Sequence, residues 1–160
     1  MSNRDEIRII EADLDDAQQG SALVGLLDSY AREPAGQSAP IDAATASGIV
    51  PGLKRHPSTL VLLAVTDDVY SGTAVCFWGF STFTARPVLN IHDLVVLPEY
   101  RGRGIGSALL DEAERRARAA GSSRLTLEVL DSNRDAKRLY ERCGFGSWSE
   151  PTLFVTKPLT

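Results

Sequence analysis

The sequence is short of the features that mark several classes of protein. Its longest unbroken apolar run, residues 60–65, has six residues, whereas a membrane-spanning helix needs about 20. Its two cysteines, Cys76 and Cys143, match no metal or redox spacing, so we expect two free thiols buried in apolar segments. The net charge of −4 argues against a nucleic-acid-binding surface. We therefore expect no membrane span, no metal site and no nucleic-acid partner.

The chain also lacks the marks of export and of several domains. The N-terminal segment MSNRDEIRI has no apolar core of the kind that a secretory signal needs. No repeat, long linker or block of like charge divides the 160 residues, and a chain of this length can bury a sizeable core. We expect a reduced, soluble, cytoplasmic protein in which residues 1–160 form one domain.

The first part of the chain predicts two helices and four strands. Residues 7–10 predict a strand, and Asp13 can cap a helix whose apolar residues recur at helical spacing as far as Tyr30. The Ala-, Ser-, Gly- and Pro-rich segment that follows predicts only a weak helix, from about Asp42 to a point before Pro51. Three apolar and β-branched segments predict strands, the first two joined by a turn at 67–72, and these are 60–65, 73–83 and 88–97.

A helix that begins at Ile105 is the most clearly marked element. Apolar residues recur at helical spacing on one side, acid–base pairs four residues apart lie on the other, and Gly121 suits the position after its end. The apolar stripe consists of Ile105, Leu109, Ala113, Ala117 and Ala120, and the pairs are Asp111–Arg115, Glu112–Arg116 and Glu114–Arg118.

The remaining residues predict a strand, a helix and a last strand. Residues 124–130 alternate as a strand does, a helix begins near Asn133 and stops at Gly144, and residues 148–157 return as a strand. Antiparallel strands followed by strand–helix–strand–helix–strand predict an α/β (α+β) fold with a mixed sheet.

The stretch PEYRGRGIG, residues 98–106, joins a predicted strand to the helix at Ile105. A helix N-terminus presents unpaired N–H groups and partial positive charge. Glycines at 104 and 106 would let a ligand touch the backbone, so that the corner could hold anionic oxygen, and Arg101 and Arg103 could fold over a phosphate. The alternative is a glycine-rich turn that binds nothing.

The spacing of this corner excludes two common phosphate motifs and matches a third. Position 107 is Ser, so the dinucleotide pattern G-x-G-x-x-G is absent, as is the Walker Gly-Lys-Ser/Thr. Arg101-x-x-Gly104-x-Gly106 resembles the pyrophosphate loop of the GNAT superfamily of acetyltransferases. The preceding strand HDLVV (92–96), Asn133, and the segment AKRLYERCGFG (136–146) resemble that family too. Within the superfamily the chain is most similar to the small diamine (spermidine/spermine) acetyltransferases.

The resemblance implies a fold and a donor. It implies a single GNAT-like domain with a mixed, mostly antiparallel sheet, a splayed central strand pair and flanking helices. It implies acetyl-CoA as donor, with no metal, a primary amine as acceptor, and direct attack in a ternary complex; it also allows a homodimer. The pantetheine arm would pair with backbone groups of Leu94 and Val96. The donor-binding residues carried over are Leu94, Val95, Val96, Arg101, Gly102, Arg103, Gly104, Ile105, Gly106, Ser107 and Asn133.

The resemblance also implies that Tyr140 is the general acid for the departing thiolate. A phenol can give a proton to an alkyl thiolate. The alternative is that Tyr140 is one aromatic of an apolar helix stripe. Asn133 would bond to the pantetheine arm, or cap the last helix, and these two roles are compatible.

The acceptor side is less defined. His92 stands where the diamine acetyltransferases have a glutamate, and it could relay the amine proton through water or be an ordinary strand histidine. Asp93 could help to hold a cationic acceptor or simply brace the strand, and Glu128 could face the acceptor side or bulk water. Acidic residues there would select a cationic amine, so we expect a diamine, a polyamine or a lysine-like compound. Three alternatives remain, namely a protein amine as acceptor, a non-catalytic acyl-CoA-sensing module, and a nucleotide-binding domain.

Overall fold

The computed structural model describes residues 6–146 and 153–159. In chain order the elements are β1 (Ile7–Glu11), α1 (Ala17–Ala31), α2 (Ala43–Arg55), β2 (Thr59–Thr66), β3 (Val69–Ser81), β4 (Arg86–Val96), a 3₁₀-helix (Pro98–Tyr100), α3 (Ile105–Ala119), β5 (Arg124–Leu127) and α4 (Arg134–Arg142).

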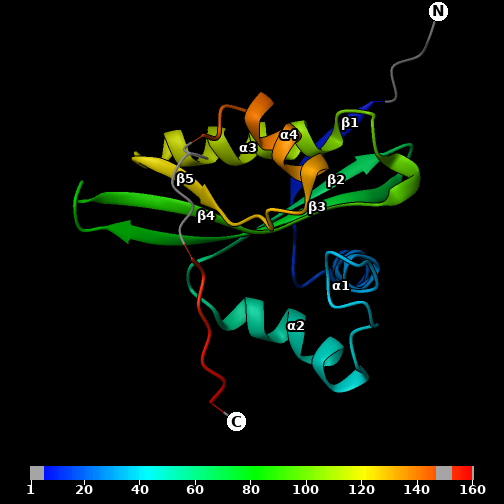
Figure 1. Ribbon diagram of the computed structural model, residues 1–160. Coiled ribbons are helices and arrows are strands. Elements are labelled where there is room, and N and C mark those ends of the chain that lie inside the picture. The colour runs from blue at the N-terminus through cyan, green and yellow to red at the C-terminus, as the bar shows by residue number, and fades with distance from the viewer. Residues whose placement is uncertain (1–5, 147–152, 160) are drawn as a thin grey trace, which may run out of the picture.

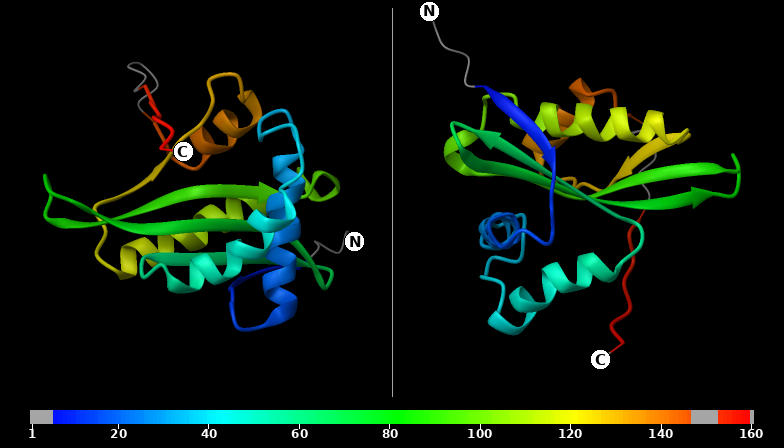
Figure 2. Two further views of the ribbon diagram at one scale, coloured as in Figure 1. Left: turned by 90° about the horizontal axis from the view of Figure 1, so that it is seen from below. Right: turned by 180° about the vertical axis from the view of Figure 1, so that it is seen from behind.

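One mixed sheet forms the centre of the molecule, with the strand order β1-β2-β3-β4-β5. The first four strands pair antiparallel, and β5 pairs parallel with β4. Helices α3 and α4 cover one face of the sheet, and α1 and α2 lie on the other (Figures 1 and 2). The predicted α/β fold with a mixed, mostly antiparallel sheet and flanking helices is confirmed.

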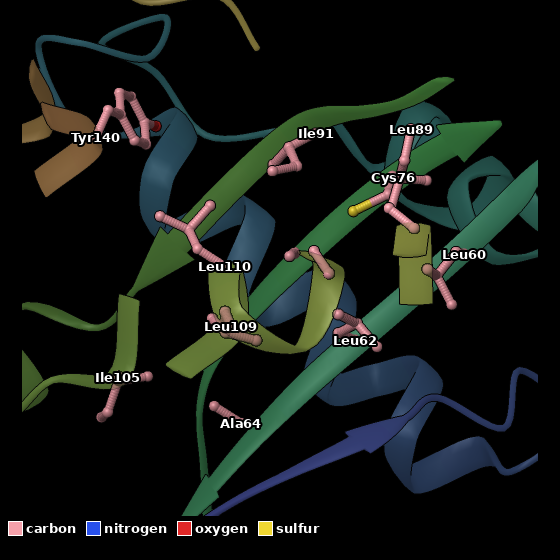
Figure 3. Packing of buried hydrophobic residues seen from close by; sticks show 13 residues of the cluster. Leu60, Leu62, Ala64, Cys76, Leu89, Ile91, Ile105, Leu109, Leu110 and Tyr140 are labelled. Carbon is pink, nitrogen blue, oxygen red and sulfur yellow. The ribbon is translucent and has the colours of Figure 1, made fainter. Parts of the chain in front are cut away.

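Strand β2 shows why the sheet is covered on both faces. All but its first residue are buried, and its side chains alternate between the two faces. Leu60, Leu62 and Ala64 belong to the cluster that contains Leu109 of α3 (Figure 3). Val61 packs in a separate cluster with Leu23 of α1. Because apolar burial is the main favourable term in folding, this strand holds the two helical layers together.

The turn between β2 and β3 is shorter than predicted. Asp67 and Asp68 have φ angles of 50° and 61°, and β3 begins at Val69. Two successive residues with positive φ form the tight hairpin turn whose twist matches that of the strands, and Asp tolerates this conformation. The predicted turn at 67–72 is therefore wrong at its end, since the two aspartates suffice.

Both helices of the α1–α2 layer differ in one boundary from the prediction. Asp16, not Asp13, caps α1, and its carboxylate accepts hydrogen bonds from the N–H groups of Gln18 and Gln19. Asp42 caps α2 as predicted, but this helix continues past Pro51 to Arg55. A proline inside a helix costs about 3 kcal/mol. Apolar packing of Leu53 against the cluster around Leu23 opposes that cost.

The second half of the chain follows the prediction except for one residue of a helix stripe, one ion pair and two strands. Gly121 follows the end of α3 with a φ of 72°, as predicted, but Ala120 is exposed and does not extend the apolar stripe. Arg115 pairs with Glu112 rather than with Asp111. The pairs Glu112–Arg116 and Glu114–Arg118 are formed. Strand β5 stops at Leu127 instead of residue 130. Of the last predicted strand, residues 153–157 are exposed and form no strand, and residues 148–152 lie outside the described part.

Two smaller predictions concern the cysteines and membrane insertion. Both thiols are free; Cys76 is buried as expected, whereas Cys143 is only half-buried. No helix within the described residues has the length and apolar character needed to cross a bilayer.

Candidate functional site

Strands β4 and β5 part at the centre of the sheet. Their parallel pairing joins residues 88–91 to residues 124–127, whereas β4 continues on β3 to Val96. On the β5 side, β4 beyond Ile91 has no strand partner among the described residues. The N–H of Leu97 bonds to Ser71 of β3 at 2.9 Å, and backbone groups alternate along a strand. Those of Leu94 and Val96 therefore face the gap, as in a splayed strand pair.

A cleft of about 600 Å³ lies at this gap. One wall is β4 from Leu94 to Val96, the second is the loop and the first turn of α3, and the third is α4 with Tyr140. Of the eleven residues carried over for the donor, ten line it and Arg103 does not. Those ten are Leu94, Val95, Val96, Arg101, Gly102, Gly104, Ile105, Gly106, Ser107 and Asn133.

The glycine corner faces this cleft with two left-handed residues. Gly102 and Gly104 have φ angles of 77° and 89°, a region that costs other residues about 1–2 kcal/mol. Gly104 is the N-cap of α3, and no side chain caps that end. The first N–H groups of α3 are therefore available to an anion.

Gly106 has a different reason to be glycine. A Cβ atom there would lie 2.9 Å from Cδ2 of Leu139 in α4, which is closer than two carbon atoms pack. A side chain at position 106 would therefore require the Leu139 side chain to shift, and glycine lets α3 and α4 approach without that shift. That approach brings Tyr140, one residue beyond Leu139, to the cleft.

The two arginines of the corner are exposed and already have partners. Arg101 donates to the Val96 carbonyl oxygen at 3.0 Å and to the Glu33 carboxylate at 2.5 Å. The guanidinium of Arg103 lies 4.9 Å from the ring centre of Tyr100, a cation–π geometry. Arg101 therefore places a cationic side chain on the cleft wall, and Arg103 lies beside the same corner outside the lining.

Tyr140 belongs both to the core and to the cleft. Its side chain is 8% exposed and packs in the main cluster (Figure 3). Its ring lies edge-on to Phe145 at 5.8 Å, and no described residue accepts a hydrogen bond from its hydroxyl. Burial, and secondarily Tyr30, raise the pKa of Tyr140 to about 12. Its phenol is therefore a proton donor that stays protonated at neutral pH.

Asn133 also serves the local structure and lines the cleft. Its Oδ1 accepts from the N–H of Ala136 at 3.2 Å and so caps α4. Capping is one of the two roles expected for it, and the side chain stands on the cleft wall at the same time.

A second cavity, of about 700 Å³, lies between α1, α2 and strands β3 and β4. We call it the acceptor-side cavity. Tyr30 and Ala35 line both cavities, so the two share a wall. His92 and Asp93 line the acceptor-side cavity. Glu128 is exposed and lines neither cavity.

The two polar residues of this cavity have different surroundings. The His92 ring is exposed and lies edge-on to Phe77 at 5.4 Å. Asp93 is half-buried, and no described residue donates a hydrogen bond to its carboxylate. Burial raises the pKa of Asp93, and the neighbouring His92 opposes this shift. A cation placed in the cavity would favour the ionised form of Asp93.

The structure adds residues that sequence reasoning missed, and three of them come from the first half of the chain. Tyr30, Glu33 and Ala35 line the cleft from the end of α1 and the segment after it. Tyr30 stood in an apolar helical stripe, and nothing in the sequence distinguished it from a core residue. Glu33 and Ala35 stand in a segment without a motif, so no signal could have found them.

Comparison with known proteins agrees with this geometry. Residues 20–145 match the model of the acetyltransferase (GNAT) family. The chain is 33% identical over 103 residues to the uncharacterised N-acetyltransferase YhfO of Bacillus subtilis, and 38% identical over 73 residues to the thialysine N-ε-acetyltransferase of Bos taurus. These matches cover 64% and 46% of the chain, and 66% and 42% of the respective relatives. The chain thus spans less than two thirds of either relative.

A solved structure of the same fold is aminoglycoside N-acetyltransferase AAC(6')-Iy in complex with CoA. It matches with a TM-score of 0.75 and 16% identity, covering 98% of each chain. Identity this low shows the shared fold alone. The family model, by contrast, matches well over half of the sequence. The chain therefore belongs to the acetyltransferase (GNAT) family.

Proposed function

We propose that this protein transfers the acetyl group of acetyl-CoA to the primary amine of a small molecule. The observation that carries the proposal is the shared wall of two cavities. One is the cleft with the glycine corner and Tyr140, and the other contains His92 and Asp93. Family membership and the CoA complex of a protein with the same fold support acetyl-CoA as the donor.

The donor would lie along the cleft from its glycine end to Tyr140. Its pyrophosphate would accept hydrogen bonds from the first N–H groups of α3, with Arg101 and Arg103 adding charge. Its pantetheine arm would pair with Leu94 and Val96, whose backbone groups face the gap left by β5, as an added strand does. Asn133 stands on the opposite wall, within the same cleft.

The amine must lose a proton before it attacks. An alkylamine has a pKa of about 10.4, so at pH 7 only about one molecule in 10^3.4 is the free base, a deficit of about 4.6 kcal/mol. His92 is exposed on the acceptor side and would receive this proton, directly or through water. Asp93 would hold the ammonium form beside it before the proton leaves.

The transfer then needs one more proton. The amine nitrogen bonds to the thioester carbon, and a backbone N–H would stabilise the oxyanion that forms. The C–S bond breaks, and the Tyr140 hydroxyl would protonate the departing thiolate. Burial raises the pKa of this phenol to about 12, which alone makes it a weaker acid. A thiolate that leaves beside the apolar wall of the cleft would also become a stronger base, because burial disfavours its charged form, and it would remain matched to the phenol.

Two measurements test the proposal. In a thermal-shift screen, acetyl-CoA and CoA should raise the melting temperature, because a ligand that binds only the folded state stabilises it, whereas ATP and NAD should not. In a thiol-release assay, acetyl-CoA and a panel of primary amines should give CoA in proportion to acetylated amine. A shift without thiol release would favour the acyl-CoA-sensing alternative, and release only with peptide N-termini or lysine side chains would favour a protein acceptor.

A further inference from the structure

The polarity of the residues that line the acceptor-side cavity indicates what kind of amine it suits. Its lining is mostly apolar, and the residues that form its walls include Leu27, Ile41, Ile49, Leu53, Val75 and Phe77. Polar groups come from His92 and Asp93 at the β4 side and from Tyr30, Gln37 and Thr45. The last three already donate hydrogen bonds to protein oxygens, namely those of Ala35, of Ala39 and Pro40, and of Asp42. The polar groups without such a partner among the described residues therefore lie at the β4 end of a mostly apolar cavity.

Charge in this cavity is limited to that end. Among the described residues that line it, none is Lys or Arg, and Asp93 is the one carboxylate. The neighbouring acids are engaged elsewhere. Asp28 accepts from Arg32 at 2.7 Å and from the N–H of Ile41 at 2.8 Å, and it lines a separate groove between α1 and α2. Glu33 lines the donor cleft and not this cavity, and in this structure it pairs with Arg101, while Asp42 caps α2.

We propose that the acceptor is a monoamine, with a single primary ammonium group on an apolar alkyl or aromatic body. The inference rests on the proposed function. The ammonium pairs with Asp93, and the body lies against Phe77 and the α1–α2 wall. A half-buried carboxylate without a hydrogen-bond donor suits a cationic head group, and an apolar wall suits what that head group carries.

Charged acceptors fit this cavity less well. The second ammonium of a diamine would be desolvated among apolar side chains with no carboxylate beside it. The carboxylate of an amino acid would find neither Lys nor Arg on the described walls. Each unpaired charge lowers the selectivity constant kcat/KM, because its desolvation is not compensated. The acidic residues of the sequence led to a different expectation, a diamine, a polyamine or a lysine-like compound, and the comparison of acceptors described below tests the two against each other.

Two glycines of α2 shape the apolar part. Gly48 and Gly52 line the cavity and are four residues apart, so they share one face of the helix. A Cβ atom at either would meet nothing within 4 Å. These positions leave room for the amine's body without being required by the fold, which makes them suitable for a test.

The first experiment compares acceptors of similar length. We expect kcat/KM for 2-phenylethylamine and hexylamine to exceed that for 1,4-diaminobutane, lysine and 2-aminoethylphosphonate by at least about tenfold, the scale of one apolar contact in an enzyme pocket. A preference for any of the charged amines would overturn the inference and leave acetyl transfer intact. If no amine on the panel supports thiol release, that result would count against the proposed function instead.

The second experiment fills the cavity. Gly48→Leu should lower kcat/KM for 2-phenylethylamine at least about tenfold, while ethylamine, which is too short to reach α2, is acetylated as before. Gly25→Leu is the matched control, because Gly25 lines the separate α1–α2 groove and its Cβ also meets nothing within 4 Å. Equal effects on both amines would overturn the assignment of the cavity.

A binding measurement keeps the inference testable even without turnover. Calorimetric titration of 2-phenylethylamine into the CoA-loaded protein should show binding that Asp93→Asn weakens at least about tenfold and Gly48→Leu also weakens. Melting temperatures would confirm that both variants are folded. No binding to the wild-type protein, or binding that neither substitution affects, would overturn the inference.

Discussion

The guanidinium of Arg101 joins the glycine corner to the segment that follows α1, because it donates to the Glu33 carboxylate at 2.5 Å and to the Val96 carbonyl at 3.0 Å. Both charged side chains are partly exposed, and such pairs contribute at most about 1 kcal/mol. A phosphate could therefore displace Glu33 from Arg101. Donor binding would then release a residue that lines the cleft.

We predict that Glu33→Gln tightens acetyl-CoA binding by about two- to fivefold, which corresponds to the loss of a competing pair of that strength. Calorimetry measures this change. Glu114→Gln, which removes the partner of Arg118 on the exposed side of α3, is the control and should leave the dissociation constant unchanged. Weaker binding in the Glu33 variant would mean that the pair shapes the cleft rather than competing with the donor.

We predict that Gly104→Val abolishes detectable acetyl-CoA binding in a protein that remains folded. The substitution places a β-branched side chain at a φ of 89° beside the unpaired N–H groups of α3, and the strain costs about 1–2 kcal/mol. Gly121→Val imposes a comparable strain at a φ of 72° beyond the far end of α3. It should lower the melting temperature similarly but retain binding, as calorimetry would show. Wild-type affinity in the folded Gly104 variant would refute the role of the corner.

We predict that Tyr140→Phe lowers kcat by about 10²–10⁴-fold, the usual contribution of a general acid, with little change in acetyl-CoA affinity. Stability at pH 7 should also be unchanged, since no described residue accepts from this hydroxyl. Tyr100→Phe is the control, because Tyr100 lines the same cleft and a phenyl ring still faces Arg103. If kcat stays at the wild-type value while chemistry limits turnover, Tyr140 is not the general acid and only packs in the core.

We predict that His92→Gln lowers kcat at pH 7 and that the difference from wild type shrinks as the pH approaches 10. The reason is that the free amine becomes abundant near its own pKa of about 10.4, so a base is needed less. His56→Gln is the control; His56 lies 5.0 Å from Phe77, the ring that His92 also contacts, but it does not line the acceptor-side cavity. A pH–rate profile identical to that of wild type would exclude His92 as the base.

We predict that Glu112 stabilises the fold in a pH-dependent way. Hydrogen bonds from Arg115, and then from Arg116, hold the pKa of Glu112 at about 2, below its ordinary value of 4.5. A carboxyl with a lowered pKa stabilises the folded state fully above about 4.5, and this contribution is lost as the pH falls through 2. Urea unfolding of Glu112→Gln should therefore differ most from wild type at neutral pH and converge with it near pH 2. A difference independent of pH would indicate lost packing instead.

Local pattern was enough to predict much of the fold and one end of the site. The helix from Ile105, the cap at Asp42 and the three central strands follow from spacing that neighbouring residues set among themselves. The glycine corner was predictable for the same reason, because Gly102 and Gly104 take left-handed φ angles that a short sequence can reveal. The other residues predicted to line the cleft beside the corner were identified from the resemblance to the GNAT superfamily.

Tertiary structure decided the boundaries and the acceptor side. The segment DLDD offers several caps for α1, and in the structure Asp16 accepts from the first N–H groups of the helix. Helix α2 continues past Pro51 because Leu53 packs against the core, which outweighs a local rule. Tyr30, Gly48 and Asp93 line the acceptor-side cavity together. No local sequence pattern predicts that residues so far apart in the chain lie close in space. The sequence by itself thus determined the elements and the glycine corner, whereas contacts between distant segments determined the helix boundaries and the lining of the acceptor-side cavity.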